Sequence, residues 1–366
     1  AGRDIIDLGM GNPDHPPPQH VIDKLCEVAG KASAHGYSQS RGIPGLRKAQ
    51  ANYYARRFGV ELDPEREVVV TMGSKEGLSS MATAIVAPGD VVLAPSPSYP
   101  IHTYGFIIAG ATIRSVPTTP NEEYWDALDQ AMAYTSPRPS VLVVNYPSNP
   151  TAETVDLAFY ERLVKWAREN EVWVLSDLAY SELYYDGKPT RSILEVPGAK
   201  DVAVEFTSMS KTYSMAGWRM GFAVGNPTLI AALTRVKSYL DYGAFTPIQA
   251  AACAALNGPQ DIVEENRLRY QRRRDVMVES FTRAGWEIPS PPASMFAWAP
   301  LPPGFEHMGS LDFSKQLLEQ AGVAVAAGIG YGEEGEGYVR IAMVENEQRI
   351  RQAARNIKRF LQRSNA

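Results

Sequence analysis

The sequence is poor in cysteine and contains no long apolar run. It has two cysteines, Cys26 and Cys253, among 366 residues. These are too few for a disulfide framework, and we expect both to be small apolar filler in a reducing compartment. No apolar stretch approaches the ~20 residues that span a bilayer, and no signal peptide is visible. These absences predict a cytoplasmic protein that does not enter a membrane.

The sequence also lacks a strong excess of either positive or negative charge. The chain has 36 Lys and Arg residues against 41 Asp and Glu residues, which gives a net charge of −5. The densest basic run, at residues 267–274, has helical spacing and the acidic neighbours Glu264, Glu265 and Asp275. It is therefore expected to be a solvated helix face, and we predict no nucleic-acid partner.

What the sequence does contain is a regular alternation of strand-like and helical segments over its first 255 residues. Strands are expected at residues 67–71, 91–94, 112–116, 141–145, 172–176, 202–207 and 220–224. Helices are expected at residues 21–29, 46–58, 73–87, 101–109, 124–133 and 157–170. This pattern is typical of α/β proteins with a mostly parallel central sheet and helices on both faces.

The pattern changes after about residue 255. A long polar helix is expected at residues 261–284, followed by shorter strands and a final helix at residues 347–363. The chain is longer than one hydrophobic core usually supports. We therefore predict a large domain at residues 36–255 and a smaller α+β domain built from residues 1–35 and 256–366.

The most distinctive stretch is SMSKTYSMAGWRMG, at residues 208–221. A lysine becomes nucleophilic near neutral pH in a desolvated site beside another cation. Ser208 and Ser210 offer short hydroxyl groups close to Lys211, and Arg219 offers a planar fork suited to a phosphate. Most such strings are surface loops, but a Schiff-base lysine with phosphate-binding neighbours is what a pyridoxal phosphate enzyme requires.

The whole stretch resembles the lysine signature of the class I and II, fold-type I aminotransferases. It matches that signature at its small residues, at Lys211, at Arg219 and at Gly221. Further motifs follow in the order of the family from Ile5 to Leu361. The resemblance implies that residues 36–255 form a large pyridoxal phosphate-binding domain.

Residues directly after the expected strands carry the cofactor contacts that the resemblance implies, because ligands of open α/β sheets bind beyond the carboxyl ends of the strands. Gly73-Ser74-Lys75 opens a helix, whose N-terminus favours a phosphate; the alternative is a simple turn. Tyr99 is expected to stack on the cofactor ring, unless it is a packed loop tyrosine. His102 receives no role.

Three polar residues after two further strands complete the expected contacts to the ring. Asp177 would keep the pyridine nitrogen protonated, and Tyr180 would donate to the phenolate oxygen of the ring. Asn149 would bond the same oxygen. Helix capping by Asp177 is the alternative. The family usually has a glycine where this chain has Ala152, so the turn after Asn149 is expected to differ in shape.

The remaining expected contacts concern the substrate and a second subunit. Arg340 resembles the family arginine that forks onto the substrate α-carboxylate, which bidentate pairing explains, and Gly11 would add a backbone N–H. Tyr37 resembles the tyrosine that reaches the cofactor phosphate of the neighbouring subunit, which implies a homodimer. No metal is expected.

The resemblance predicts a transaminase that uses pyridoxal 5'-phosphate, with Lys211 as the base at the α-carbon and Asp177 and Tyr180 as catalytic partners. Its substrates would be amino acids and 2-oxo acids. Local strings look most like bacterial alanine (glutamate–pyruvate) transaminases, near the LL-diaminopimelate aminotransferases, so L-alanine with 2-oxoglutarate is the first expectation. Lys75 and Arg41 could hold a side-chain carboxylate.

Other functions stay open at this point. Aspartate, methionine or LL-diaminopimelate could be the preferred amino donor. A carbon–sulfur β-lyase or an aminocyclopropane carboxylate synthase would share the fold and these motifs. A pyridoxal phosphate-sensing regulator would share the fold and add a DNA-binding region, and none is visible before Ile5.

Overall fold

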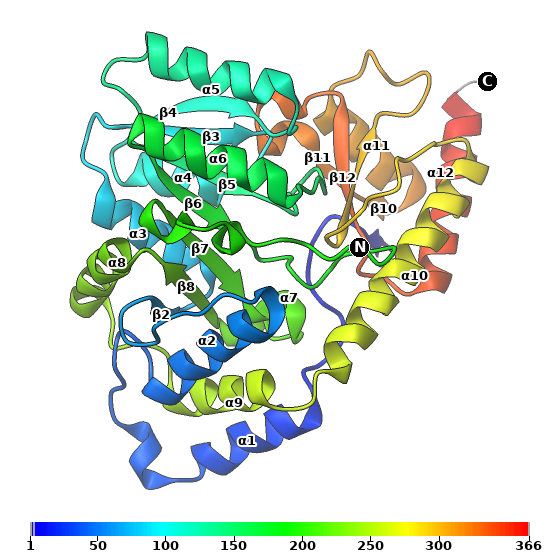
Figure 1. The fold of residues 1–366 in the computed structure, drawn as a ribbon. Coiled ribbons are helices and arrows are strands. Elements are labelled where there is room, and N and C mark those ends of the chain that lie inside the picture. The colour runs from blue at the N-terminus through cyan, green and yellow to red at the C-terminus, as the bar shows by residue number, and fades with distance from the viewer. Residues whose placement is uncertain (1, 3, 365–366) are drawn as a thin grey trace.

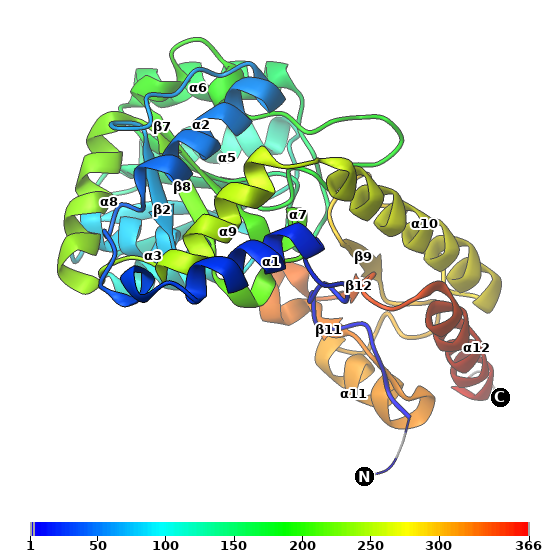
Figure 2. The same ribbon diagram turned by 90° about the horizontal axis from the view of Figure 1, so that it is seen from below.

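A computed structural model describes residue 2 and residues 4–364 of the chain. The predicted α/β fold is confirmed: a seven-stranded sheet lies between two layers of helices, and a smaller helical and antiparallel part packs beside it (Figures 1 and 2). No helix within the described residues is long and apolar enough to cross a membrane.

The seven-stranded sheet has the order β2-β8-β7-β6-β5-β3-β4. Strands β3 to β7 are parallel to one another, whereas β8 runs antiparallel to both β2 and β7. The strands of this sheet are β2 (Val68–Thr71), β3 (Val91–Ser96), β4 (Thr112–Pro117), β5 (Val141–Asn145), β6 (Trp173–Asp177), β7 (Ala203–Ser208) and β8 (Gly221–Gly225).

Helices cover both faces because strand residues point alternately to the two sides. In β5, Leu142 and Val144 pack with one set of helices, and Val141 and Val143 with the other. The first set is α2 (Pro44–Phe58), α5 (Glu122–Tyr134), α6 (Leu157–Asn170) and α9 (Thr246–Asn257). The second set is α3 (Ser74–Ile85), α4 (Ile101–Ile108) and α8 (Pro227–Leu240).

A separate apolar core lies in the C-terminal part and includes Ile6 and Leu8 from the N-terminal segment. It is built on an antiparallel sheet of β9 (Phe296–Pro300), β12 (Tyr338–Ala342) and β11 (Ala326–Ala327), and on the helices α10 (Asp261–Ala284), α11 (Ser310–Ala321) and α12 (Glu347–Ser364). Strand β1 (Ile6–Asp7) pairs in parallel with β10 (Val323–Ala324).

Helix α1 (Gln19–Ala29) lies along α9, and its Val21 belongs to the core of the large sheet (Figure 2). The remaining short elements are α7 (Met209–Thr212) and the 3-10 helices at Ala32–His35, Ile193–Glu195, Ala199–Asp201, Ala216–Trp218, Gly328–Tyr331 and Glu333–Gly335. The exact division of the chain into two domains stays a prediction, and residues 1, 3, 365 and 366 of its small domain lie outside the described residues.

Candidate active site

A cavity of about 210 Å³ lies where the carboxyl ends of β5, β6 and β7 meet the C-terminal part. This is where an open α/β sheet is expected to bind its ligand. The structure brings almost all of the predicted site residues to this cavity: Gly11, Ser74, Lys75, Tyr99, Asn149, Asp177, Tyr180, Ser208, Ser210, Lys211, Arg219 and Arg340.

Lys211 lies in the short helix α7, which begins directly after the end of β7. Ser208 is the last residue of β7, and its Oγ accepts a hydrogen bond from Ser210 N at 3.1 Å, which caps α7. The Lys211 Nζ donates to Gly11 O at 2.6 Å. Burial, and then the nearby guanidinium groups of Arg340 and Arg219, lower the pKa of Lys211 from 10.5 to about 8. A useful fraction of this amine is therefore neutral near physiological pH.

The N-terminal end of α3 forms a cationic pocket with Arg219. Gly73 precedes the helix with φ 87°, and a Cβ built there would lie 2.2 Å from Arg219 Nη2. Only glycine lets the guanidinium approach this turn so closely. The first N–H groups of a helix have no partner within it, and Ser74 and Lys75 line the cavity. The arrangement suits an anion such as a phosphate.

The opposite side of the cavity holds a buried carboxylate. Asp177 ends β6, and its Oδ2 lies 2.8 Å from His102 Nε2, with the histidine fully buried. Asn145 Nδ2 donates to Asp177 O at 2.8 Å. Asp177 Oδ1 also accepts from Ala179 N at 3.2 Å, but a turn and not a helix follows it, so Asp177 does not have the alternative role of a helix cap. The ring of His102 thus orients a carboxylate that faces the cavity.

His102 and Asn145 are site residues that sequence reasoning missed. Tyr99 lies in the turn before α4 and His102 is the second residue of that helix; His102 N donates to Tyr99 O at 3.0 Å, and the rings are 6.0 Å apart. The closeness of His102 to Tyr99 in the sequence was the available signal. The partner of His102 is 75 residues away in the chain, so no local motif could show the contact.

Arg340 is held rigidly in the middle of β12. Its Nη1 donates to Asn149 Oδ1 at 2.9 Å and its Nη2 donates to Gly9 O at 2.8 Å. The Cζ atom lies 3.9 Å from the ring centre of Phe296 and 5.0 Å from that of Tyr331. Cation–π contacts on a planar guanidinium fix its plane. Asn149 therefore helps to fix the orientation of the Arg340 guanidinium.

Gly11 closes the cavity against Phe296. A Cβ at residue 11 would lie 2.5 Å from the Phe296 ring, so no larger residue fits without a shift of that ring. Tyr180 packs on the same ring, at 5.7 Å between centroids, and burial raises the pKa of its hydroxyl above the ordinary range. The tyrosine is therefore a neutral hydrogen-bond donor at every working pH.

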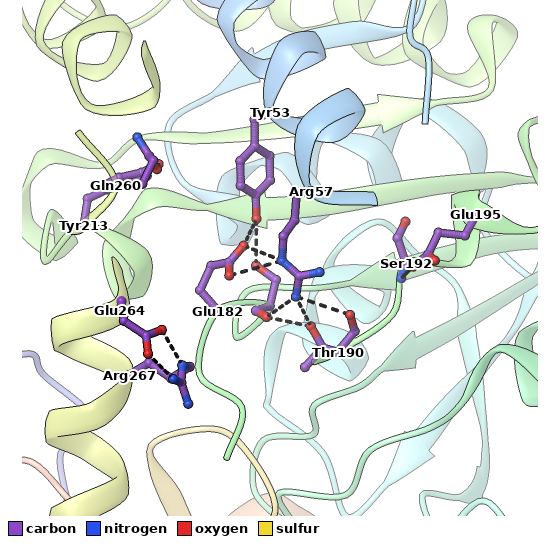
Figure 3. Close-up of polar contacts among 11 residues, drawn as sticks. Tyr53, Arg57, Glu182, Thr190, Ser192, Glu195, Tyr213, Gln260, Glu264 and Arg267 are labelled. Carbon is purple, nitrogen blue, oxygen red and sulfur yellow. Dashed lines mark hydrogen bonds and ion pairs between the residues drawn. The ribbon is translucent and has the colours of Figure 1, made fainter. Parts of the chain in front are cut away.

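Tyr53 and Arg57, both on α2, converge on Glu182, which lies two residues after Tyr180 in the chain (Figure 3). Arg57 Nε donates to both carboxylate oxygens of Glu182, at 3.1 and 3.2 Å, and Tyr53 donates its hydroxyl to the same group. Arg57 Nη2 also donates to Thr190 O at 3.3 Å. Because Glu182 is only two residues from Tyr180, this ion pair limits how far that tyrosine can move.

Two loop residues bear on expectations from the sequence. Ala152 adopts φ 62°, a left-handed conformation that favours glycine, and a difference in turn shape from the family stays a prediction. Arg41 does not reach the cavity; its guanidinium pairs with Glu65. Of the two cations proposed for a side-chain carboxylate, Lys75 is the one that lines the cavity.

Tyr37 lies on the surface, away from the cavity of its own chain. Its side chain is 88% exposed, and its ring centre lies 4.5 Å from that of Tyr242, which is 61% exposed, with the two rings tilted by 31°. An exposed aromatic pair is unusual on a monomer and is typical of a contact with another molecule.

These groups fit pyridoxal phosphate on the evidence of their own chemistry. A phosphate suits the cationic end of α3, where Gly73 leaves room for Arg219. A protonated ring nitrogen suits Asp177, whose carboxylate has the His102 ring as its side-chain partner. Lys211, with its lowered pKa, supplies the amine that an aldehyde needs.

Known proteins of similar sequence and fold give independent findings. The sequence model of the family "Aminotransferase class I and II" matches residues 3–357. The putative aminotransferase AatC of Rhizobium meliloti is 65% identical, over 99% of this chain and 89% of that protein. The glutamate-pyruvate aminotransferase AlaC of Escherichia coli is 52% identical, over 98% of this chain and 87% of that protein.

Two further relatives widen the comparison. An LL-diaminopimelate aminotransferase of Moorella thermoacetica is 44% identical, over 98% of this chain and 92% of that protein. The substrate-bound structure of BacF from Bacillus subtilis superposes with a TM-score of 0.90 at 36% identity, over 97% of this chain and 90% of that chain.

Proposed function

The chain belongs to the class I and II aminotransferase family, and from this premise we propose that it transfers an amino group between L-alanine and 2-oxoglutarate, giving pyruvate and L-glutamate. It is an enzyme, and members of its family use pyridoxal phosphate. The roles of single residues and the substrate pair below are part of the proposal.

Each end of the cofactor has its own residues in this proposal. When bound, pyridoxal phosphate supplies an aldehyde for an amine and a ring that withdraws electrons from the α-carbon. Ser74, Lys75 and Arg219 hold the phosphate at the start of α3. Asp177, oriented by His102, holds a proton on the ring nitrogen.

The face and the oxygen of the ring have further partners. Tyr99 covers the face, where Lys75 Nζ lies 5.5 Å from the centre of the tyrosine ring. Tyr180 donates its hydroxyl to the ring oxygen, and Asn149 lies beside it. All of these residues line the cavity, and their separate roles follow the resemblance to the family.

Lys211 and Arg340 act on the substrate itself. Arg340 binds the α-carboxylate with its planar fork, which Phe296 and Asn149 keep in place. Gly11 lies next to the reacting amine, because Gly11 O accepts a hydrogen bond from Lys211 Nζ. The neutral Lys211 amine would take the α-proton onto Nζ and deliver it, within the same half-reaction, to the cofactor carbon that carries the aldehyde. In the second half of the transfer it would run the same proton shift in reverse.

The observation that carries the proposal is the convergence of Lys211 and Arg340 on one small cavity. The carboxylate-binding cation lowers the pKa of the base and fixes the substrate next to it. A lysine whose pKa is lowered to about 8 is useful as a base or nucleophile, whereas a protein that only binds its ligand has no need for it.

The proposed substrate pair, L-alanine and 2-oxoglutarate, is supported by the resemblance to known proteins and by the position of one cation, Lys75. AlaC, whose name states the glutamate–pyruvate reaction, is 52% identical to this chain, whereas the LL-diaminopimelate aminotransferase is 44% identical. Lys75 lines the cavity and could pair with the side-chain carboxylate of 2-oxoglutarate. Aspartate, methionine and LL-diaminopimelate are the alternatives that the test must separate.

A homodimer in the cytoplasm completes the proposal. Tyr37 would contribute to the phosphate site of the neighbouring subunit. Its support is the exposed pair with Tyr242, together with Tyr239 and Leu240, which are 74% and 67% exposed. A surface of this kind is buried when two copies associate.

The test is a half-reaction screen. The loaded enzyme is mixed with one amino acid at a time, without oxo acid, and its visible absorbance and the released oxo acid are measured. We expect alanine and glutamate to react fastest and to release one oxo acid per site. The variant Lys211→Ala is the control and should show neither change.

Other outcomes point elsewhere. Repeated release of pyruvate and ammonia from one amino acid would identify a β-lyase. A response to LL-diaminopimelate but not to alanine would contradict the substrate pair. No response to any amino acid would contradict transamination and favour a regulatory role.

A further inference from the structure

A buried lysine that no part of the proposed mechanism uses lies directly behind the phosphate end of α3. Lys237, on α8, is fully buried. Its Nζ lies 3.3 and 3.2 Å from the two carboxylate oxygens of Glu76 and 2.9 Å from Asp241 Oδ2. A charged lysine without solvent is retained only where carboxylates pair with it.

Glu76 gives this lysine its connection to the cofactor site. Glu76 is the third residue of α3, and its Oε2 accepts from Met72 N at 2.8 Å. Its Oε1 accepts from Ser80 Oγ at 2.7 Å. The carboxylate therefore fixes the turn at residues 72–73, which places Gly73 against Arg219.

The same carboxylate creates an electrostatic difficulty. It lies within the first turn of α3, one residue after Lys75, where a phosphate with up to two negative charges is to bind. Like charges within a few ångströms repel strongly in a water-poor site. Lys237 weakens this repulsion because its ammonium lies 3.2 Å from Glu76 Oε2 and offsets the charge of that carboxylate.

Asp241 keeps Lys237 in place. It stands one helical turn after Lys237 at the end of α8, and its Oδ1 accepts from Gly243 N at 2.6 Å. The Asp241 carbonyl accepts from Ser40 Oγ. The lysine is thus tethered on one side to a fixed loop and presents its charge to Glu76 on the other.

From these contacts we propose that Lys237 is a positioning residue for the cofactor phosphate. It neutralises Glu76, so that Glu76 can shape the turn at Gly73 without repelling the phosphate. The inference rests on the proposed cofactor site. It predicts an effect on phosphate recognition alone, because neither Lys237 nor its partners Glu76 and Asp241 line the cavity.

The test compares two cofactor forms on the full-length, cofactor-free protein. Pyridoxal phosphate and pyridoxal, which lacks the phosphate, are each titrated while the visible absorbance of the lysine-bound form is followed. For Lys237→Met we expect the affinity for pyridoxal phosphate to fall at least about tenfold. The affinity for pyridoxal should stay within about twofold of the parent protein, because no phosphate is involved.

Two further variants separate charge from structure. Lys237→Arg keeps the charge and should bind pyridoxal phosphate nearly as the parent does. The double variant Lys237→Met with Glu76→Gln removes both charges and should recover the lost affinity; it also remains informative if the single variant does not fold. Lys315→Met is the control at an exposed lysine, whose side chain is 61% exposed.

The outcomes are distinct. The inference is overturned if Lys237→Met binds pyridoxal phosphate normally, if it loses affinity for both forms equally, or if the double variant stays as weak as the single one. Failure of the parent protein to bind pyridoxal phosphate would instead contradict the proposed cofactor site.

Discussion

The acid–base state of Lys211 in the cofactor-free protein gives a prediction with a definite magnitude. Its pKa is lowered from 10.5 to about 8. At pH 7.5, about one quarter of the Lys211 amines should then be neutral, against about one in a thousand for an ordinary lysine. The amine should therefore react with electrophiles at neutral pH roughly two hundred times more readily than pKa 10.5 would allow.

The perturbation is Arg340→Met, which removes one cation and keeps an apolar side chain against Phe296. Burial is the largest cause of the lowered pKa of Lys211, and the charge of Arg340 is the next. The variant should therefore raise the pKa of Lys211 above 8 but leave it below 10.5. The neutral fraction at pH 7.5 falls accordingly.

The assay is trace acetylation of the cofactor-free protein between pH 6 and pH 11, with the labelled peptide of Lys211 measured by mass spectrometry. An added Nα-acetyl-lysine amide is the internal standard. The half-labelling pH should lie near 8 for the parent and higher for Arg340→Met. Labelling of Lys211 in parallel with the standard, or an unchanged midpoint in the variant, would refute the reasoning.

Three further predictions concern single positions. Glu171 ends α6 with φ 55°, so Glu171→Gly should raise the free energy of unfolding by about 1 kcal/mol, whereas Glu169→Gly inside the helix should lower it by about 1 kcal/mol; opposite signs in urea denaturation check the pair. Gly11→Ala should raise the KM for every amino acid because its methyl group meets Phe296, and adding Phe296→Leu should lower this KM only in part, because the Phe296 ring also holds the Arg340 guanidinium; an unchanged KM in Gly11→Ala contradicts the packing argument. His102→Leu, which removes the ring nitrogen 2.8 Å from the β6 carboxylate, should lower kcat at least about tenfold, and His102→Gln less; equal kcat in all three proteins would argue against an orienting role.

Local patterns made much of the fold and the site predictable. The apolar strands and the amphipathic helices are read from neighbouring residues, and most expected elements agree with the structure within a few residues. The lysine stretch is likewise contiguous, so its motif is complete in the sequence. Arg340 could be placed because its strand context resembles the family.

Contacts between distant residues could not be predicted in this way. The partner of His102 is 75 residues away, and Lys237 and Glu76 are 161 residues apart. Phe296 faces Gly11 only because the N-terminal segment packs against the C-terminal part beside the large sheet. Side-chain pairing of this kind depends on topology, which no single segment specifies.

Helices α8 and α9 had a usable local signal that was not assigned. Asn226 caps α8 by accepting from Thr228 N and Leu229 N, both at 3.0 Å, and Pro227 occupies the first helical position. An Asn-Pro pair before an apolar periodic run is a typical helix start. No helix was expected between β8 and α10, and the two helices found there leave only short loops in this region.

The central claim is that Lys211 carries the cofactor. The loaded enzyme is treated with borohydride, which makes the link between amine and cofactor permanent, and is then digested and mapped by mass spectrometry. The account predicts one phosphopyridoxyl group per chain, on the peptide that contains Lys211, and none in Lys211→Ala. A label on another lysine, or no label on the loaded parent protein, would contradict it.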